Sequence, residues 1–280
     1  MKESQPLSFD FYLLIPYYNN LPGLISSLKS ISYDPTLYAL LIVDDGSREA
    51  LRREDLSPYL PELLSVTILR QANNQGITRA LNAGMQWLDE HGNCRYVARL
   101  DCGDLCDPTR FRQQVALLDE QPEIDLVGSW CIFKNFATGD SYRYVTPTGY
   151  KKIIKGMHFR NIFIHPTVMW RSDVTRKAGI YPENFPHAED YGFFYEIISR
   201  GKAAVIPAYL VICEINPKGL SLFFRQEQLK SRMRVVRQYG KNRLYSLMGI
   251  VKLWILLAVP YKFVLQTKNF VYGIKRNDVI

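Results

Sequence analysis

Short apolar runs alternate along the chain with segments in which apolar residues recur every three or four positions. The continuous runs predict buried strands at residues 11–16, 39–45, 65–70 and 95–101. The periodic segments predict helices at residues 21–31 and 76–91. Strands that are apolar throughout and separated by helices are typical of parallel sheets with both faces covered. The pattern therefore predicts an α/β fold with a mainly parallel sheet flanked by helices.

The first two predicted strands end in aromatic or acidic residues. Tyr17 and Tyr18 follow the first run, and Asp44 and Asp45 end the second. Neighbouring parallel strands end at one edge of the sheet, where ligands of such folds bind. A tyrosine there can stack on a base, and a carboxylate can accept a hydrogen bond from a ring N–H or a ribose hydroxyl. Asp-Asp-Gly-Ser by itself is also a common turn, and the tyrosines are equally suited to cover the sheet edge.

The fourth predicted strand leads into Asp101-Cys102-Gly103-Asp104. Two carboxylates three positions apart offer hard oxygen ligands to a divalent cation that keeps several waters and bridges substrate phosphates. Asp and Gly are also ordinary turn residues, so the pair gains weight only from the other strand ends. Together the three strand ends suit a nucleotide diphosphate with its metal.

The composition favours a globular protein in a reducing compartment. A chain of 280 residues with 47% hydrophobic residues is long and apolar enough to bury a large core. The first apolar run starts only at residue 11, and it is too short and too polar-flanked for a signal peptide. The five cysteines are odd in number and irregularly spaced, which favours the cytoplasm over an oxidising compartment. A zinc site formed by His91, Cys94, Cys102 and Cys106 is disfavoured, because the spacing of these residues matches no common structural zinc site.

The positive charge is concentrated in the C-terminal part. The net charge is +8, but residues 218–280 contain 13 Lys and Arg against 2 acidic residues, whereas residues 1–217 contain 22 basic and 25 acidic residues. We therefore predict two parts, an α/β domain at 1–217 and a basic helical extension at 218–280. Such asymmetry indicates an anionic partner for the extension, either a membrane surface or a polyanion.

Two segments of the extension have different characters. Residues 223–240 predict an amphipathic helix with a basic stripe. Residues 244–265 are rich in Leu and Ile, but Lys252 and Pro260 interrupt them, so they are too short and too charged to span a bilayer. An interfacial element on an anionic leaflet fits this pattern. A helix pair packed on the α/β domain or on a second subunit is the alternative.

Six segments in order along residues 9–215 resemble those of the family 2 inverting glycosyltransferases with the GT-A fold. The segments are "FYLLIPYYNN", "LLIVDDGS", "NNQGITRALNAGM", "YVARLDCGDLCDPTRF", "FIHPTVMWRSDVTRKAGIYPENF" and "HAEDYGFFYEII". Six ordered blocks are far more specific than any single motif. The resemblance implies a GT-A (Rossmann-like) mixed, mainly parallel sheet and the transfer of a sugar from a nucleotide donor.

The resemblance also implies roles for individual residues. It assigns Pro16, Tyr18 and Asp45 to the base of the donor nucleotide. Asp101 and Asp104 would lie near the ribose, the metal and the diphosphate. A divalent cation, Mg²⁺ or Mn²⁺, is implied as cofactor. Members of this kind usually read Asp-x-Asp-Asp, whereas Gly103 stands at the third position here. Either Asp104 takes over the metal, or metal binding is weaker and more of the diphosphate charge is carried by cationic side chains such as Arg79 or by backbone N–H groups.

Asp190 in "HAED" matches the catalytic base of the family. Transfer requires a group that removes the proton of the acceptor hydroxyl, and a carboxylate at a helix start favours its charged form. Glu189 and Asp190 are equally suited to cap the helix. His187 and Glu189 are further candidates for contacts with the acceptor or the diphosphate. His165, in "FIHPT", suits the same role or that of a hydrogen-bonded structural histidine.

The function predicted from these features is inverting glycosyl transfer on the inner face of the cytoplasmic membrane. The donor would be a UDP-, GDP- or dTDP-sugar, and the acceptor a glycan that is lipid-linked, as in O-antigen, capsule or lipopolysaccharide synthesis. No nucleic acid partner is expected, and the oligomeric state stays open. One alternative is a non-catalytic protein that binds a nucleotide or polyanion at the membrane surface. The other is a nucleotidyltransferase, but "IPYYNNLPG" lacks the Gly-rich phosphate loop such an enzyme would carry after its first strand.

Overall fold

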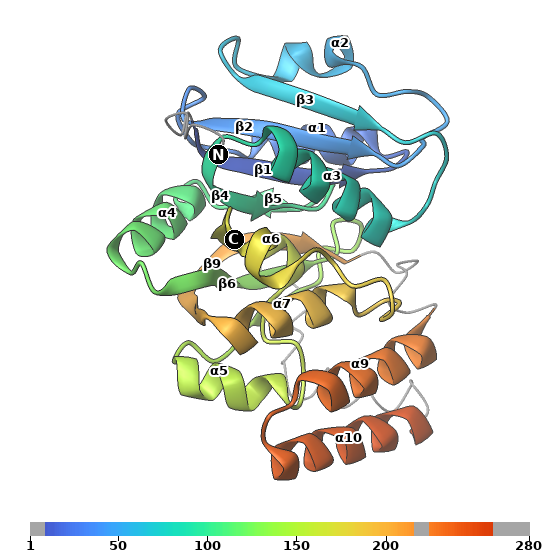
Figure 1. Cartoon of the computed structure of the whole chain (residues 1–280). Coiled ribbons are helices and arrows are strands. Elements are labelled where there is room, and N and C mark those ends of the chain that lie inside the picture. The colour runs from blue at the N-terminus through green and yellow to red at the C-terminus, as the bar shows by residue number, and fades with distance from the viewer. Residues whose placement is uncertain (1–8, 216–223, 260–280) are drawn as a thin grey trace.

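The computed structural model describes residues 9–215 and 224–259, in which helices cover a nine-stranded sheet (Figure 1). The sheet order is β3-β2-β1-β4-β8-β6-β9-β5, and β7 pairs with β6. The strands are β1 (Phe9–Tyr17), β2 (Tyr38–Asp44), β3 (Ser65–Arg70), β4 (Cys94–Arg99), β5 (Leu105–Cys106), β6 (Ile124–Lys134), β7 (Ser141–Tyr144), β8 (Met169–Arg171) and β9 (Lys202–Glu214). The four strands predicted from the sequence are β1 to β4, each within two residues of its expected bounds.

Parallel pairing is confined to two parts of the sheet. The strands of the N-terminal half, β3-β2-β1-β4, are all parallel, as the apolar runs predict. The three-residue strand β8 lies antiparallel to both β4 and β6, and β5 and β7 also pair antiparallel. The long pair β6 and β9 is parallel again. The α/β fold with a mixed sheet is thus confirmed. The short antiparallel strands lack the long apolar runs that made the others predictable.

Helices cover the sheet on both faces because side chains along each strand alternate between them. Phe11, Leu13 and Ile15 of β1 pack into one core cluster with α1 (Leu21–Lys29) and α4 (Arg110–Glu120). Tyr12 and Leu14 pack into the other with α3 (Ile77–His91) and α7 (Glu189–Arg200). The shorter elements are α2 (Arg53–Leu56), η1 (Ser57–Tyr59), α5 (Tyr150–Met157), η2 (His165–Thr167) and α6 (Val174–Ala178).

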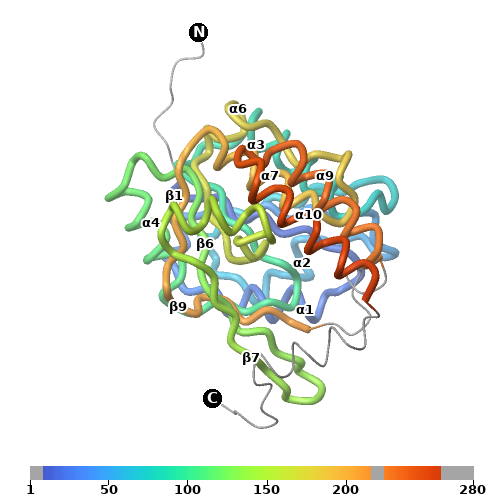
Figure 2. The backbone as a smooth tube through the Cα atoms, turned by 90° about the horizontal axis from the view of Figure 1, so that it is seen from below, coloured from blue at the N-terminus to red at the C-terminus, as the bar shows by residue number. Residues whose placement is uncertain are grey.

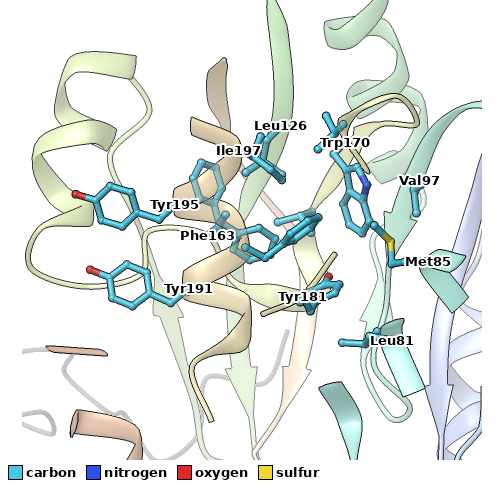
Figure 3. Close-up of a cluster of buried hydrophobic side chains, with 14 of the residues drawn as sticks. Leu81, Met85, Val97, Leu126, Phe163, Trp170, Tyr181, Tyr191, Tyr195 and Ile197 are labelled. Atoms are coloured by element: carbon cyan, nitrogen blue, oxygen red, sulfur yellow. The ribbon is translucent and has the colours of Figure 1, made fainter. Parts of the chain in front are cut away.

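Helix α7 is the central helix of the second cluster (Figure 3). Trp170 of β8 is fully buried and meets Phe193 of α7 edge to face, with ring centroids 5.7 Å apart. Tyr191 and Tyr195 extend from the opposite side of α7, away from the sheet, as Figure 3 shows. The helix is therefore buried over most of its length, its exposed side chain lies in the last turn at Arg200, and its first turn is fixed in the interior of the domain.

Two C-terminal helices extend the domain, and the first of them packs on α7. They are α9 (Arg225–Tyr239) and α10 (Arg243–Ala258), which form the lower edge of the molecule in Figure 1. Val235 and Val236 of α9 belong to the same buried cluster as α7. The predicted basic helix is confirmed, whereas the predicted apolar segment is described only to residue 259. The predicted domain boundary at residue 217 falls outside the described residues and stays a prediction.

Helix α10 packs on α9 and on the turn after α5. Leu229 and Met233 of α9 form a small cluster with Leu253 of α10. Gly249 lies so close to the turn that a β carbon there would be 1.8 Å from the carbonyl oxygen of His158. A glycine is required for this approach, because any side chain would overlap with the backbone. In the described ranges we find no helix with the length and apolarity needed to cross a bilayer.

All five cysteines lie in the described part of the chain and carry free thiols. Four of them are buried, at positions 94, 106, 131 and 213. Burial is the largest cause of the raised pKa of Cys94, to about 12. Buried thiols of this kind are inert packing residues.

Candidate functional site

Three of the polar strand ends meet at one edge of the sheet. β1 lies between β2 and β4 and is parallel to both, so the three strands end on the same side. Tyr18 follows β1 and is 49% exposed, whereas Tyr17 is buried beside it. Pro16, one position earlier, is half-buried in the strand. Tyr18 is therefore the tyrosine free to stack on a ligand, and Tyr17 belongs to the core.

The two neighbouring aspartates at the end of β2 have different surroundings. Asp44 is fully buried and accepts hydrogen bonds from the backbone N–H of Ser47, at 2.9 Å, and from the Arg70 guanidinium. Asp45 accepts from the backbone N–H groups of Gln75, at 2.8 Å, and Gly76, at 2.9 Å. Asp44 thus fixes the turn after β2. Asp45 holds the loop that begins α3 against the ligand edge.

Arg79 lies in the first turn of α3 and is 57% exposed. Its Nε is 3.4 Å from a carboxylate oxygen of Glu183, which is also exposed. An exposed pair of this kind is weak and easily exchanged for another anion. Arg79 is therefore available to an anionic ligand at this edge.

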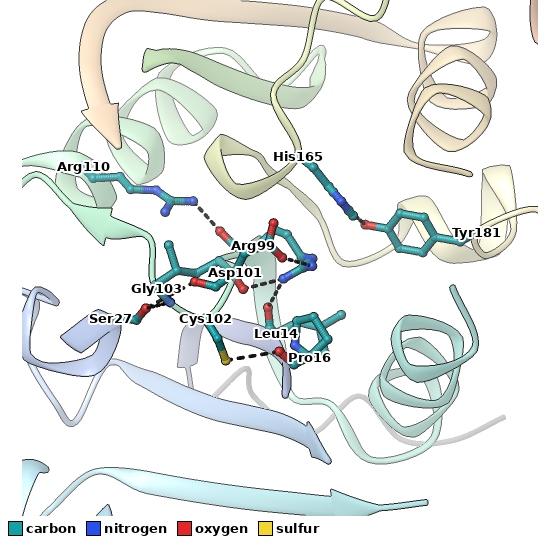
Figure 4. A network of polar contacts seen from close by, with 11 residues as sticks. Leu14, Pro16, Ser27, Arg99, Asp101, Cys102, Gly103, Arg110, His165 and Tyr181 are labelled. Atoms are coloured by element: carbon teal, nitrogen blue, oxygen red, sulfur yellow. Dashed lines mark hydrogen bonds and ion pairs between the residues drawn. The ribbon is translucent and has the colours of Figure 1, made fainter. Parts of the chain in front are cut away.

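Asp101 is held by a buried arginine that the sequence analysis did not select (Figure 4). Arg99 is completely buried at the end of β4, and its guanidinium donates to Asp101 and to the carbonyl oxygens of Leu14 and Leu100. Burial acts to raise the pKa of Asp101, but the charge of Arg99, the neighbouring His165 and the hydrogen bond from Arg99 together outweigh burial, and the pKa is lowered. Asp101 is thus an ionised carboxylate, and its side chain is 34% exposed at the edge where β4 ends.

Asp104, in contrast, is enclosed. It is only 5% exposed, and one carboxylate oxygen accepts the backbone N–H of Glu214 at 2.7 Å, at the end of β9. Burial, and then repulsion from Asp101, raises its pKa well above the ordinary range. A carboxyl group that is enclosed and already accepts a backbone N–H is poorly placed to bind a metal, and a raised pKa disfavours its charged form. The surroundings of Asp104 therefore do not support its predicted role at the metal.

Gly103 leaves a space that another carboxylate fills. Its φ angle is +101°, in the region that favours glycine. A β carbon built there would lie 2.3 Å from a carboxylate oxygen of Glu214. The third position of the motif thus has no side chain of its own, and an acidic residue from β9 lies beside it.

These residues supply only some of the oxygen ligands that a divalent cation needs. Asp101 is ionised and partly open, as a ligand must be, whereas Asp104 is not. Within residues 9–215 and 224–259, no three His, Cys, Asp or Glu side chains gather closely enough to hold a metal by themselves. A Mg²⁺-type site does not need such a group, because one or two carboxylates, waters and substrate phosphates suffice. Asp101 fits the role of the single protein carboxylate in such a site.

His165 lies next to this network but is held as a neutral ring. Its Nε2 is 3.0 Å from the hydroxyl of Tyr181, and Figure 4 shows the pair beside Arg99 and Asp101. Burial, and then the charge of Arg99, lowers the pKa of His165 to about 3. Tyr181 is in turn anchored by Asn82 of α3, which exchanges two 2.9 Å hydrogen bonds with its backbone. His165 is therefore a fixed, uncharged hydrogen-bonding group close to Arg99 and Asp101.

Asp190 is the second residue of α7, so its predicted place at a helix start is confirmed. One carboxylate oxygen accepts from the Asn161 amide at 2.9 Å, and the other accepts from the backbone N–H of Tyr191 at 2.6 Å. Burial raises its pKa, and the charge of Arg232 in α9 partly offsets this. The carboxylate of Asp190 is thus oriented by two hydrogen-bond donors, and the charge of Arg232 acts on it.

Glu189 precedes Asp190 and is also buried, with 7% of its surface exposed. Burial, and then repulsion from Asp190, raises its pKa to about 7. None of the described residues donates a hydrogen bond to its Oε2. The charges of Arg99 and Asp101 also act on this carboxyl group. Since Asp101 likewise acts on Asp190, the carboxylates of α7 and of the β4 end share one region.

Helix α9 closes the other side of this region. Gln228 donates to the carbonyl oxygen of His187 at 3.0 Å, and the His187 ring stacks on Phe224 with centroids 4.3 Å apart. His187 itself has a φ angle of +61° and lies 3.5 Å from the Glu227 carboxylate. Arg232 is one helical turn after Gln228, so it faces the same way, towards the first turn of α7. The ring of His187 is thus engaged with α9, not with the edge of the sheet.

Three residues of the site were missed from the sequence: Arg99, Asn161 and Arg232. A signal existed for Arg99, because a charged residue within the apolar run "YVARL" must find a buried partner. Asn161 and Arg232 carry no local signal. They meet Asp190 only because the turn after α5 and helix α9 pack on the start of α7.

The chain resembles known proteins in sequence and in fold. The model of the family "Glycosyl transferase family 2" matches residues 12–174. The amylovoran biosynthesis glycosyltransferase AmsE of Erwinia amylovora is 30% identical over 199 residues, which are 68% of this chain and 70% of AmsE. The family match covers the part of the chain that carries β1 to β4 and Asp101.

Two solved structures share the fold at low sequence identity. S. aureus TarS 1–349 in complex with UDP-GlcNAc has a TM-score of 0.63 at 15% identity, over 88% of this chain and 72% of that one. The chain spans 41% of the longer TarS structure. The mannosyltransferase PcManGT of Pyrobaculum calidifontis, in complex with GDP-Man and Mn²⁺, has a TM-score of 0.62 at 13% identity, over 96% of this chain and 84% of that one. With its GT-A sheet and the family match over residues 12–174, this chain belongs to glycosyl transferase family 2 and is a glycosyltransferase.

Proposed function

We propose that this enzyme transfers a sugar from a nucleotide donor to a glycan hydroxyl with inversion, and that Asp190 is the general base. The observation that carries the proposal is the position of Asp190. Its carboxylate is fixed by Asn161 and lies in the electrostatic field of Asp101, which marks the donor edge of the sheet. A base and a donor site must share one region for a proton to leave the acceptor as the sugar is transferred.

The proposed step is a single displacement. The acceptor hydroxyl gives its proton to the Asp190 carboxylate, and its oxygen forms a bond to the anomeric carbon. The bond from that carbon to the nucleoside diphosphate breaks, and the diphosphate leaves with the electron pair. One displacement from the opposite face inverts the anomeric centre. The fixed orientation of Asp190 supports this role because a base must be within hydrogen-bond reach of its proton.

Donor and acceptor classes are proposed from the relatives. TarS is in complex with UDP-GlcNAc and PcManGT with GDP-Man, which supports a nucleotide-sugar donor. Tyr18, Asp45 and Arg79, at the carboxyl edge, are the proposed contacts for base and diphosphate. AmsE is named for amylovoran biosynthesis, which supports a role in bacterial polysaccharide synthesis. We propose a lipid-linked glycan as acceptor and the inner face of the cytoplasmic membrane as location.

A divalent cation, Mg²⁺ or Mn²⁺, is part of the proposal. Asp101 would hold it, with waters and donor phosphates as further ligands. When bound, such an ion neutralises the charge that develops on the leaving diphosphate. The Mn²⁺ in the PcManGT complex supports this cofactor. Asp104 is the weaker candidate, because its carboxyl group is buried and has a raised pKa.

The function is tested with a panel of donors. The purified chain is incubated with UDP-, GDP- and dTDP-sugars, with Mn²⁺ and with EDTA, and released sugar and nucleoside diphosphate are measured. We expect slow hydrolysis of one class of donor, further slowed by EDTA. Failure to cleave any donor, although nucleotides bind with strong salt dependence, would favour the non-catalytic binding alternative.

Replacing Arg232 by Gln is expected to shift the pH dependence of transfer. Arg232 lowers the pKa of Asp190, so its removal lets that pKa rise further. A base works only when deprotonated, and activity therefore falls as pH falls through this pKa. The acidic limb of the kcat/KM profile should move to higher pH in the variant. Arg232→Lys should restore most of the wild-type profile, and Arg237→Gln, an exposed change on the same helix, should leave it unchanged. Identical acidic limbs in Arg232→Gln and the wild type would exclude this role.

A further inference from the structure

Helix α10 exposes a continuous apolar stripe. Six of its side chains each lie three or four positions from another of the six along the helix. This spacing places all six on one face. They are Leu244, Leu247, Met248, Val251, Trp254 and Ile255, each between 48% and 63% exposed. Of the thirteen large hydrophobic residues exposed in the described ranges, these six are on one helix. Single exposed apolar residues are ordinary, but a continuous stripe indicates an interaction surface.

The stripe faces away from the domain. On the opposite side of α10, Leu253 is buried against α9 and Gly249 touches the turn at His158. In Figure 1, α9 lies between α7 and α10, and α10 is the outermost helix. Figure 2, seen from below, shows α10 beside α9 on the face nearest the viewer. The packing of the helix is therefore complete on one side and open on the other.

Cations border the stripe. Arg243 and Lys252 are exposed on α10, on either flank of the apolar face. Lys230, Arg234 and Arg237 recur along the exposed side of α9. Residues 224–259 contain eight Lys and Arg and one acidic residue, Glu227. Among the described residues, no carboxylate forms an ion pair with any of these five cations. The surface thus combines an apolar stripe with uncompensated positive charge.

We propose that α10 lies flat on an anionic bilayer, with its apolar stripe among the acyl chains and the bordering cations among the headgroups. This inference rests on the membrane location proposed above and adds the face that binds. A helix of 16 residues cannot span a bilayer, but it can lie along the interface. A second copy of the chain fits less well. A two-fold contact through the stripe would bring the cationic borders of both copies together without counter-charge.

The orientation has a consequence for the acceptor. Gly249 rests on His158, and the same turn carries Asn161, which holds Asp190. The bilayer would therefore lie on the side of the enzyme where the proposed base is located. An acceptor anchored in the same leaflet could reach Asp190 without leaving the membrane. The nucleotide edge, at Tyr18 and Asp45, stays on the sheet side with access to the water phase.

The test measures vesicle binding without substrate, so that it does not depend on catalysis. The full chain is co-sedimented with phosphatidylcholine vesicles with and without phosphatidylglycerol. We expect binding that requires the anionic lipid and weakens with salt. The double variant Leu247→Glu/Trp254→Glu should bind at least about tenfold more weakly. Leu63→Glu is the matched control, because Leu63 is 72% exposed in the turn before β3, at the other edge of the sheet. It should bind like the wild type.

Fluorescence of Trp254 reports what covers the stripe. The difference between the wild type and Trp254→Phe isolates its signal. We expect easy quenching by acrylamide in solution and a blue shift with protection on anionic vesicles. Protection without vesicles, together with a dimer that dissociates in the double variant, would overturn the proposal in favour of self-association. Equal vesicle binding by the wild type and the double variant would overturn it as well. A circular dichroism spectrum and a urea denaturation curve like those of the wild type show that the double variant is folded.

Discussion

Replacement of Asp190 by Asn is expected to lower kcat for sugar transfer by about 10²- to 10⁴-fold, the usual contribution of a general base. The amide is close in shape to the carboxylate but cannot accept the proton of the acceptor hydroxyl. Asn161 and the Tyr191 N–H both donate to this side chain, so the variant also loses one of the two acceptor oxygens that they use. Donor binding should change little, because the donor edge lies at the ends of β1, β2 and β4. Steady-state kinetics with a soluble acceptor analogue and nucleotide titration separate the two effects.

The matched control for this variant is Glu196→Gln on the same helix. Glu196 pairs with Arg200 at the surface, and loss of such a pair costs less than about 1 kcal/mol. It should retain activity within a factor of about two. If Asp190→Asn keeps more than about a tenth of wild-type kcat while folding normally, Asp190 is not the base. Glu189, with its pKa of about 7, would then be the next carboxyl group to test.

Replacement of Arg99 by Met is expected to lower the free energy of unfolding by roughly 2–4 kcal/mol. Removal of one partner from a fully buried ion pair costs about 3–5 kcal/mol. The expected value is lower because the Asp101 side chain is 34% exposed and water can solvate it. Met fills a similar volume, but the carbonyl oxygens of Leu14 and Leu100 lose their donor. Urea denaturation followed by circular dichroism measures the change.

A double-mutant cycle with Asp101→Asn separates the interaction energy between Arg99 and Asp101 from the contribution of their other contacts. Asp101→Asn alone leaves the buried guanidinium of Arg99 without a charged partner. In Arg99→Met/Asp101→Asn neither charge is unpaired, so the loss should be smaller than the sum of the single losses. Arg200→Met, which removes an exposed guanidinium, should change stability by less than about 1 kcal/mol. Strict additivity in the cycle would mean that Arg99 and Asp101 do not stabilise each other.

The N-terminal half of the fold was predictable because its strands are buried on both faces. Such strands are apolar at every position, and the helices between them keep a regular period. Two of the strands after β4 are different. β5 has two residues and β8 has three, and both pair antiparallel with partners distant in the chain. Segments this short carry no period of their own, so contacts decide their structure.

The candidate site divides in the same way. Tyr18, Asp45 and Asp101 were predictable because each follows an apolar strand, and parallel neighbours end at one edge. Asp104 was predicted as a metal ligand on its spacing from Asp101. In the structure it turns to the backbone of Glu214, 110 positions away in the chain. The spacing in the sequence shows that two carboxylates are near each other along the chain. It does not show which hydrogen-bond donors each of them will contact in the folded protein.

The sequence by itself determined the N-terminal half of the sheet, its ligand edge and the acidic start of α7, because hydrophobic period and strand polarity are local properties. The tertiary structure alone decided three further points: Arg99 is the partner of Asp101, Arg232 and Asn161 face Asp190, and the apolar stripe of α10 points outward. Each depends on contacts between segments that are far apart in the chain. Such contacts are set by the packing of whole elements, and a local pattern holds no record of them.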